Sequence, residues 1–209
     1  MEDKTTVIAC GIFQEEVEQV LAEDDLKLSF DWREAGLHDN IERLEEDLGA
    51  AVAARLAAGG RRPALLYGCG CLPEMKAFAR ERGLAVLPVK NCLAALVGDE
   101  QLRELEKDRT MVASIGWVRK MWLGRRDSVL GWKADDYRMQ FGRYDRIVVL
   151  DTGHRPLSDE EIITCFDLVQ VPIEAMSCGL GHFQRVFLDL IRAAASAPLL
   201  WEINGQISG

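Results

Sequence analysis

The sequence predicts an α/β protein in which a mostly parallel sheet is flanked by helices. Two observations predict this class. Short apolar runs alternate with amphipathic segments along almost the whole chain, which is typical of strands connected by crossover helices. The chain has 209 residues, 48% of them hydrophobic, which suits one folded domain of this class. We therefore expect a single domain over residues 1–209.

The apolar runs give the strands, and the amphipathic segments between them give the helices. The expected strands are Thr5–Ala9, Leu26–Phe30, Ala64–Tyr67, Ala85–Pro88, Thr110–Ala113, Arg146–Leu150 and Leu168–Ile173. The expected helices are Phe13–Ala22, Ile41–Ala57, Pro73–Arg82, Leu93–Val97, Glu100–Lys107, Asp159–Cys165 and roughly Leu180–Ala195. Helices on both faces of such a sheet make a Rossmann-like, three-layer arrangement.

Three local patterns refine these boundaries. Ser158 and Glu161 form a capping box at the start of a helix, because each side chain can accept a hydrogen bond from a backbone amide that the helix leaves unpaired. Gly59-Gly60 closes the second helix, since glycine adopts the left-handed conformation that a helix end requires. Residues 116–141 carry three tryptophans among charged residues and no strand pattern, so we expect a helical insertion there.

Charge and hydropathy exclude several classes of function. The net charge is −9 and the pI about 4.9, so a nucleic-acid partner is not expected. The short basic stretch that begins at Arg119 and Lys120 is better explained by a helix face or a small anionic ligand. No apolar run approaches the ~20 residues that cross a bilayer, and the first residues lack a signal-peptide pattern. We expect a cytoplasmic protein without a membrane partner, whose cysteines are thiols, ligands or nucleophiles rather than disulfides.

Five of the six cysteines follow predicted strands. They are Cys10, Cys69, Cys71, Cys92 and Cys178. Because the carboxyl ends of parallel strands lie at one edge of a sheet, where ligands of α/β proteins bind, we expect at least three of these thiols to converge. Cys165 falls inside a helix and is assigned to the core, since cysteine is commonly buried as a small hydrophobe.

Three converging thiolates suit zinc or an iron–sulfur cluster, most simply a [4Fe–4S] cluster with one open iron position. Neither usual local spacing is present, because Cys69 and Cys71 are separated by one residue and no Cys-x-x-Cys occurs. The ligands would come from distant segments. A cysteine nucleophile is the rival interpretation, since Cys71 precedes a predicted helix whose N-terminus would lower the thiol pKa.

Several of these segments resemble the domain-of-unknown-function family 1638. The likeness is carried by Val7-Ile8-Ala9-Cys10, Leu37-His38, Tyr67-Gly68, Cys71-Leu72-Pro73-Glu74-Met75, Asn91-Cys92-Leu93, Leu96-Val97-Gly98 and Gly116-Trp117. The resemblance implies a trio of functional cysteines at Cys10, Cys71 and Cys92, and it leaves open whether Cys69 and Cys178 are additional metal ligands. Leu72 stands where many relatives have histidine. Family members are often encoded near corrinoid-dependent methyl-transfer systems, which implies anaerobic one-carbon or sulfur metabolism.

Three polar residues are candidates for orienting or protonating a small-molecule substrate at such a site. His38 precedes a helix that Asp39 and Asn40 can cap, so it is either a functional group or a histidine beside a cap. Asp151 and His154 follow the sixth predicted strand, where Asp151 could instead cap a turn. Gly179-Leu180-Gly181-His182 opens the last helix and is a weak candidate for phosphate binding.

Two functional hypotheses therefore remain. The first is an enzyme whose three-cysteine metal or iron–sulfur site acts on a small substrate. The second is a non-catalytic module that carries a corrinoid or a metal to a methyltransferase or corrinoid-protein partner. The tryptophans of residues 116–141 would roof a planar corrin in the second case, or pack the insertion in the first.

Overall fold

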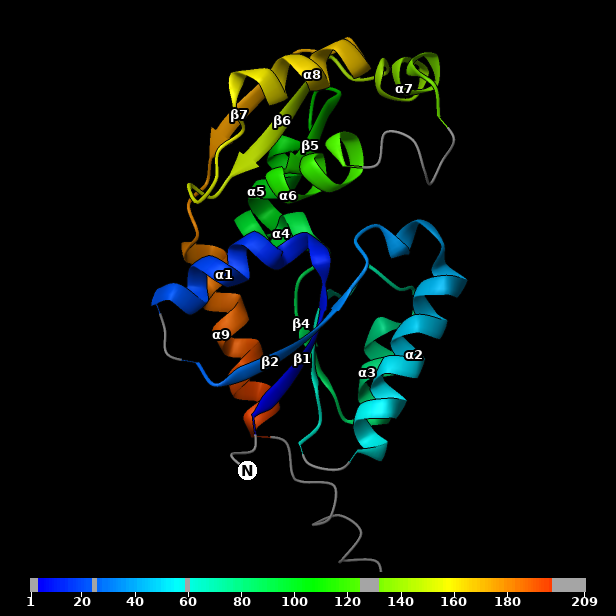
Figure 1. Cartoon of the computed structure of the whole chain (residues 1–209), viewed down its shortest axis with the longest axis vertical. Coiled ribbons are helices and arrows are strands. Elements are labelled where there is room, and N and C mark those ends of the chain that lie inside the picture. The colour runs from blue at the N-terminus through cyan, green and yellow to red at the C-terminus, as the bar shows by residue number, and fades with distance from the viewer. Residues whose placement is uncertain (1–3, 24–25, 59–60, 125–131, 197–209) are drawn as a thin grey trace, which may run out of the picture. The chain divides into compact units, whose positions relative to one another are not determined.

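The computed structural model describes residues 4–23, 26–58, 61–124 and 132–196, and it confirms the α/β class (Figure 1). The seven strands form two parallel sheets, one of four strands and one of three. The chain divides into two compact units, one for each sheet. The first comprises residues 1–11, 20–92 and 184–209, and the second residues 12–19 and 93–183. The expectation of a single folding domain stays a prediction.

The first unit is a Rossmann-like layered structure around a sheet with strand order β2-β1-β3-β4. Its strands are β1 (Thr5–Cys10), β2 (Leu28–Arg33), β3 (Ala64–Gly68) and β4 (Ala85–Leu87). Its helices are α2 (Ile41–Ala57), α3 (Met75–Arg82) and most of α9 (Gly181–Ala195). Helices α2 and α3 lie together beside the sheet in Figure 1, whereas α9 packs Phe187 against Phe30 of β2.

The second unit is built on the sheet β5-β6-β7. Its strands are β5 (Thr110–Ser114), β6 (Arg146–Asp151) and β7 (Ile173–Ser177), and its helices are α4 (Cys92–Val97), α5 (Asp99–Leu105), α6 (Ile115–Trp117), α7 (Ala134–Phe141) and α8 (Asp159–Val169). A π-helical segment covers Val118–Leu123. Helix α1 (Gln14–Glu23) and α9 each contribute residues to both units, and α4 takes its first residue from the first unit.

The tryptophan-rich insertion is helical where it is described, and it packs the core of the second unit. Trp122 is 1% exposed and contacts Trp117 and Phe141 edge to face. Trp132 packs in the same way against Tyr137. These contacts support the packing interpretation of the tryptophans. Residues 125–131 of the insertion, and Gly59-Gly60, lie outside the described residues.

The last strand begins later than expected. Leu168 and Val169 continue α8, because Cys165 and Val169 are four residues apart and both are buried on one helix face. Gln170 then ends the helix in the left-handed conformation, with its amide 2.7 Å from the carbonyl of Phe166. Strand β7 follows Pro172. The capping box of α8 is confirmed, since Ser158 and Glu161 exchange side-chain-to-backbone hydrogen bonds.

The strands are shared between two sheets rather than gathered in one. Strand β4 has only three residues and pairs with β3 irregularly, whereas β5 pairs with β6 over five residues. Apolar patterning shows where strands lie but not which ones pair, so the sequence did not reveal the division. Among the described helices, none combines the length and apolar character of a membrane span.

Candidate functional site

The candidate site lies at the carboxyl ends of β1 and β3. In the strand order β2-β1-β3-β4, β2 lies on one side of β1 and β3 lies on the other, so the direction of the connections reverses at β1. Such a reversal leaves a crevice beyond the strand ends, where α/β proteins bind ligands. Cys10 is the last residue of β1 and is 9% exposed, and Cys69 directly follows β3. These cysteines therefore border the one place in this sheet where topology predicts a ligand.

Two glycines bring the loop after β3 against the loop before α4. The amide of Cys69 donates to the carbonyl of Val89, and the amide of Gly70 to that of Lys90, both at 2.7 Å. A Cβ atom at Gly68 would lie 2.6 Å from the Cα of Asn91, and one at Gly70 would lie 2.8 Å from the Lys90 carbonyl oxygen. Only glycine allows this approach. The loops of Cys71 and Cys92 are thereby held side by side.

The thiols at this edge influence one another. Burial, with smaller contributions from the neighbouring thiols of Cys10 and Cys69, raises the pKa of the half-buried Cys71 thiol to about 11. Cys69 also donates a hydrogen bond from its thiol to the carbonyl of Leu87, at 3.1 Å. All six cysteines fall among the described residues, and none forms a disulfide. At neutral pH Cys71 is therefore a protonated thiol.

Charged and aromatic groups border the cysteines on the same unit. Arg33 at the end of β2 binds both carboxylate oxygens of Asp47 on α2 and also contacts Asp31. Burial is the main reason why the pKa of Tyr67 is raised. The thiols of Cys10 and Cys71 and the carboxylate of Asp47 add to the shift, and Arg33 opposes it. Tyr67 is 3% exposed, and its hydroxyl has no hydrogen-bond partner among the described residues.

His38 lies in the short 3₁₀ turn Leu37–Asp39 before α2. Its imidazole is 3.6 Å from the carboxylate of Asp39, and 44% of the side chain is exposed. The capping residue is Asn40, whose side chain accepts the amide of Arg43 at 2.9 Å. This geometry supports the interpretation of His38 as a histidine beside a helix cap.

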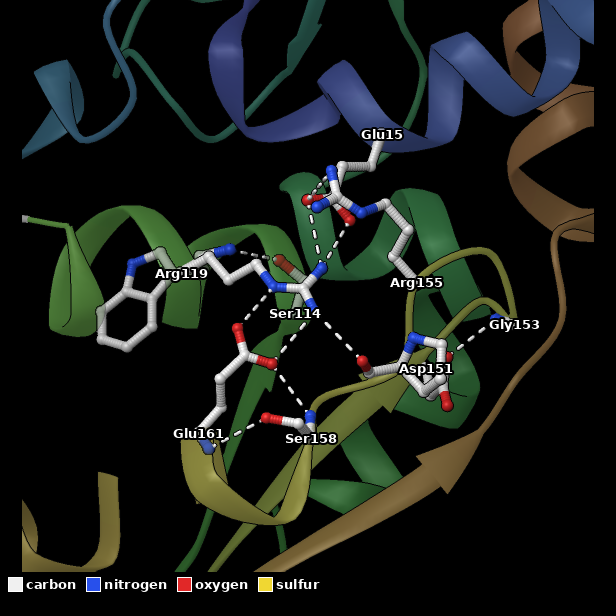
Figure 2. Close-up of polar contacts among 10 residues, drawn as sticks. Glu15, Ser114, Arg119, Asp151, Gly153, Arg155, Ser158 and Glu161 are labelled. Carbon is white, nitrogen blue, oxygen red and sulfur yellow. Dashed lines mark hydrogen bonds and ion pairs between the residues drawn. The ribbon is translucent and has the colours of Figure 1, made fainter. Parts of the chain in front are cut away.

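Asp151, His154 and Cys178 belong to the other sheet. Asp151 accepts the amide of Gly153 at 2.7 Å (Figure 2), so its side chain caps the turn after β6. His154 is exposed in that turn. Cys178 follows β7, donates its amide to the carbonyl of Asp151, and has a thiol pKa that burial raises to about 11. The expectation that these residues share an edge with the other cysteines assumed a single sheet. The strands form two sheets, and Asp151, His154 and Cys178 follow strands of a different sheet from Cys10 and Cys71.

An arginine-centred network, which the sequence did not reveal, joins distant segments of the second unit (Figure 2). Arg119 binds the carboxylate of Glu15 at 3.0 Å and that of Glu161 at 2.9 Å, and it also donates to the carbonyl of Pro156. Arg119 of the basic stretch is therefore engaged in internal ion pairs, and Lys120 donates to the side-chain oxygen of Gln14 at 3.2 Å. Glu15 lies 104 residues from Arg119 in the sequence, so no local sequence pattern predicts their ion pair.

Glu16 is a second residue that the sequence analysis missed. It lies on α1, only 3% exposed, and one carboxylate oxygen has no partner among the described residues. Burial raises the pKa of this carboxyl to about 7, with Glu15 adding to the shift and Lys120 opposing it. The sequence does not distinguish this buried glutamate from an exposed one, because the residues one helical turn away on α1 include both polar and apolar types.

A groove of about 400 Å³ lies beside the segment that follows Cys71. Its lining residues are Ile41, Glu45, Leu72, Pro73, Glu74, Ala77, Phe78, Glu81 and Arg82. The groove thus runs between α2 and α3, and the cysteines are not among its lining residues.

No group of three or more histidine, cysteine, aspartate or glutamate side chains is positioned to hold a metal ion within residues 4–23, 26–58, 61–124 and 132–196. What the fold brings to this edge of the first sheet is the end of β1, with Cys10, and the segments after β3 and β4, with Cys69, Cys71 and Cys92.

The fold and this site define an α/β protein with cysteines in the segments that border a topological switch point. The chain belongs to the DUF1638 family of proteins of unknown function, whose model matches residues 32–187. The match includes Cys71 and Cys92 and begins after Cys10. No curated protein and no solved structure matches the chain.

Proposed function

We propose that this protein binds a soft metal ion or an iron–sulfur cluster through Cys10, Cys71 and Cys92. The observation that carries the proposal is the position of these residues at the carboxyl ends of three neighbouring strands of one sheet, β1, β3 and β4. Two of those strands flank the reversal in strand order. The glycine-dependent contact between the loops that precede Cys71 and Cys92 supports the proposal, because it keeps these two backbone segments side by side.

The chemistry of the donor set fits such a group. Thiolates are the preferred ligands of zinc and of iron–sulfur clusters. The raised pKa of Cys71 means that its thiolate needs a compensating positive charge, and a bound metal supplies one as it displaces the proton. The side chains would turn about their χ1 bonds toward the metal. The thiol of Cys69 is already engaged, because it donates a hydrogen bond to the Leu87 carbonyl.

Three protein ligands leave one coordination position for a small-molecule substrate. A metal there would act as a Lewis acid, or a cluster as an electron carrier, toward that substrate. We therefore favour an enzyme over a carrier module. Nothing in the packing of the tryptophans favours a corrin ring, since Trp122 is a core residue.

The lone-nucleophile alternative is less well supported. Helix α3 begins at Met75, four residues after Cys71, so the helix N-terminus does not adjoin the thiol. A reactive cysteine has a lowered thiol pKa, whereas burial raises that of Cys71 to about 11.

The test is an absorbance spectrum with metal analysis of anaerobically purified protein, before and after reconstitution with iron and sulfide or with zinc. We expect a broad visible-blue shoulder with stoichiometric iron, or a colourless protein with one zinc. Sharp corrin bands would instead support the carrier hypothesis. A featureless spectrum without bound metal after both reconstitutions would contradict the proposal.

A further inference from the structure

Tyr67 carries a buried hydroxyl without a partner. The residue is 3% exposed, and its hydroxyl oxygen makes no hydrogen bond to any described residue. Buried polar groups are nearly always hydrogen-bonded, and an unpaired one lowers stability. An unpaired hydroxyl at this depth therefore either lowers the stability of the fold or has a partner that the described residues do not supply.

The register of the sheet places Tyr67 beside Cys10. Strands β1 and β3 are parallel neighbours in which Ala9 pairs with Leu66. The next residues in register are Cys10 and Tyr67, and paired residues of parallel strands direct their side chains to the same face. The thiols of Cys10 and Cys71 both influence Tyr67 electrostatically. The phenol thus lies on the same side of the sheet as the first thiol of the proposed site.

The carboxylate that acts electrostatically on Tyr67 is already engaged. Asp47, which also influences Tyr67, accepts hydrogen bonds from Arg33 on both carboxylate oxygens. The nearby sulfur atoms belong to thiols, which are weak acceptors. A thiolate or sulfide sulfur bound to a metal carries negative charge and accepts far more strongly. The acceptor that the phenol lacks would therefore arrive with the metal.

We propose that Tyr67 is a positioning residue that donates a hydrogen bond to a negatively charged sulfur of the group bound at Cys10 and Cys71, either a metal-bound thiolate or a cluster sulfide. The inference rests on the proposed function. The phenol keeps its proton, and metal binding releases only the protons of the thiols. Such a donor stabilises the bound state and tunes the electronic properties of the metal, as outer-sphere partners of metal ligands commonly do.

Tyr67→Phe separates this role from a structural one, because it removes the hydroxyl and keeps the ring. In metal-free protein we expect the midpoint of thermal unfolding to stay unchanged or rise by a few degrees, since the variant deletes an unpaired buried group. With Co²⁺ as the probe, affinity measured by chelator competition should fall about tenfold, and the thiolate-to-cobalt charge-transfer band should shift. Tyr137→Phe, in the core of the second unit, is the matched control and should leave affinity and band unchanged.

Three results would overturn the inference. A lower unfolding temperature in metal-free Tyr67→Phe, with the affinity and charge-transfer band of wild type, would show that the hydroxyl serves the fold. Failure of the wild-type protein to bind Co²⁺ at all would remove the proposed function and the role of Tyr67 with it. Wild-type binding together with an unaltered Tyr67→Phe variant would reject the role of Tyr67 alone.

Discussion

The burial of Glu16 makes the stability of the protein depend on pH. Its carboxyl has a pKa of about 7 in the folded protein, because burial disfavours the charged form. The unfolded chain releases this proton near the ordinary value of 4.5. Between pH 4.5 and pH 7 the folded protein therefore holds one more proton on Glu16 than the unfolded chain does. The contribution of Glu16 to stability is therefore complete below pH 4.5 and is lost as the pH rises through 7.

Glu16→Gln should remove this dependence. The shift corresponds to about 3 kcal/mol of unfolding free energy, so wild type should lose about that much, relative to the variant, between pH 4.5 and pH 8. Urea unfolding across this range measures the difference. Glu18→Gln, at an exposed position on the same helix, should follow wild type. Parallel stability curves for wild type and Glu16→Gln would show that Glu16 is ionised in the folded protein.

Residue types also indicate how far the candidate site could be predicted. Five cysteines were identifiable as candidates because each follows an apolar run, and the family resemblance selected Cys10, Cys71 and Cys92 among them. Tyr67 was not, since a tyrosine inside an apolar run resembles any core aromatic residue. Asp151 and His154 were grouped with the cysteines on the assumption of one sheet, which only long-range strand pairing can decide.

At the scale of elements, Arg119 joins the first turn of α1 to the capping box of α8 (Figure 2). Glu161 has two tasks, because its carboxylate accepts the amide of Ser158 and also pairs with Arg119. The hydrogen bond from Arg119 is the largest reason why the pKa of Glu161 lies below its ordinary value. One guanidinium thus fixes a helix start that local sequence alone would leave to a capping box.

Arg119→Ala should lower the unfolding free energy by about 2 kcal/mol, because two partly buried carboxylates lose a partner that makes charged hydrogen bonds to them. Chemical denaturation at neutral pH measures the change. Arg155→Ala is the matched control. Its guanidinium is 3.9 Å from Glu15 and 63% exposed, so its loss should cost under about 0.5 kcal/mol. Equal effects of the two substitutions would contradict the central role of Arg119.

Element boundaries were predicted best where local chemistry sets them. Helix α2 was predicted at Ile41–Ala57 and lies at those residues, with Asn40 as its cap. The start of β7 was predicted five residues early, because Leu168 and Val169 are as apolar as a strand but complete the buried face of α8.

For the whole molecule, the α/β class followed from the alternation of apolar and amphipathic segments, and the structure confirms it. The division into two sheets did not follow, because it depends on β5 pairing with β6 rather than with β4. This division assigns the cysteines to separate groups. Cys10, Cys69, Cys71 and Cys92 follow the first sheet, Cys178 follows the second, and Cys165 is fully buried in the second core.

The central claim is that Cys10, Cys71 and Cys92 act together as the ligands of one metal or cluster. Metal content after anaerobic reconstitution, measured for single alanine variants of each cysteine, tests it most directly. A group held by three ligands depends on all of them, so iron or zinc should fall together in Cys10→Ala, Cys71→Ala and Cys92→Ala. Cys165→Ala and Cys178→Ala should retain wild-type content. The account would be contradicted if Cys178→Ala lost its metal as fully as the trio, or if only Cys71→Ala altered the protein while no variant bound metal.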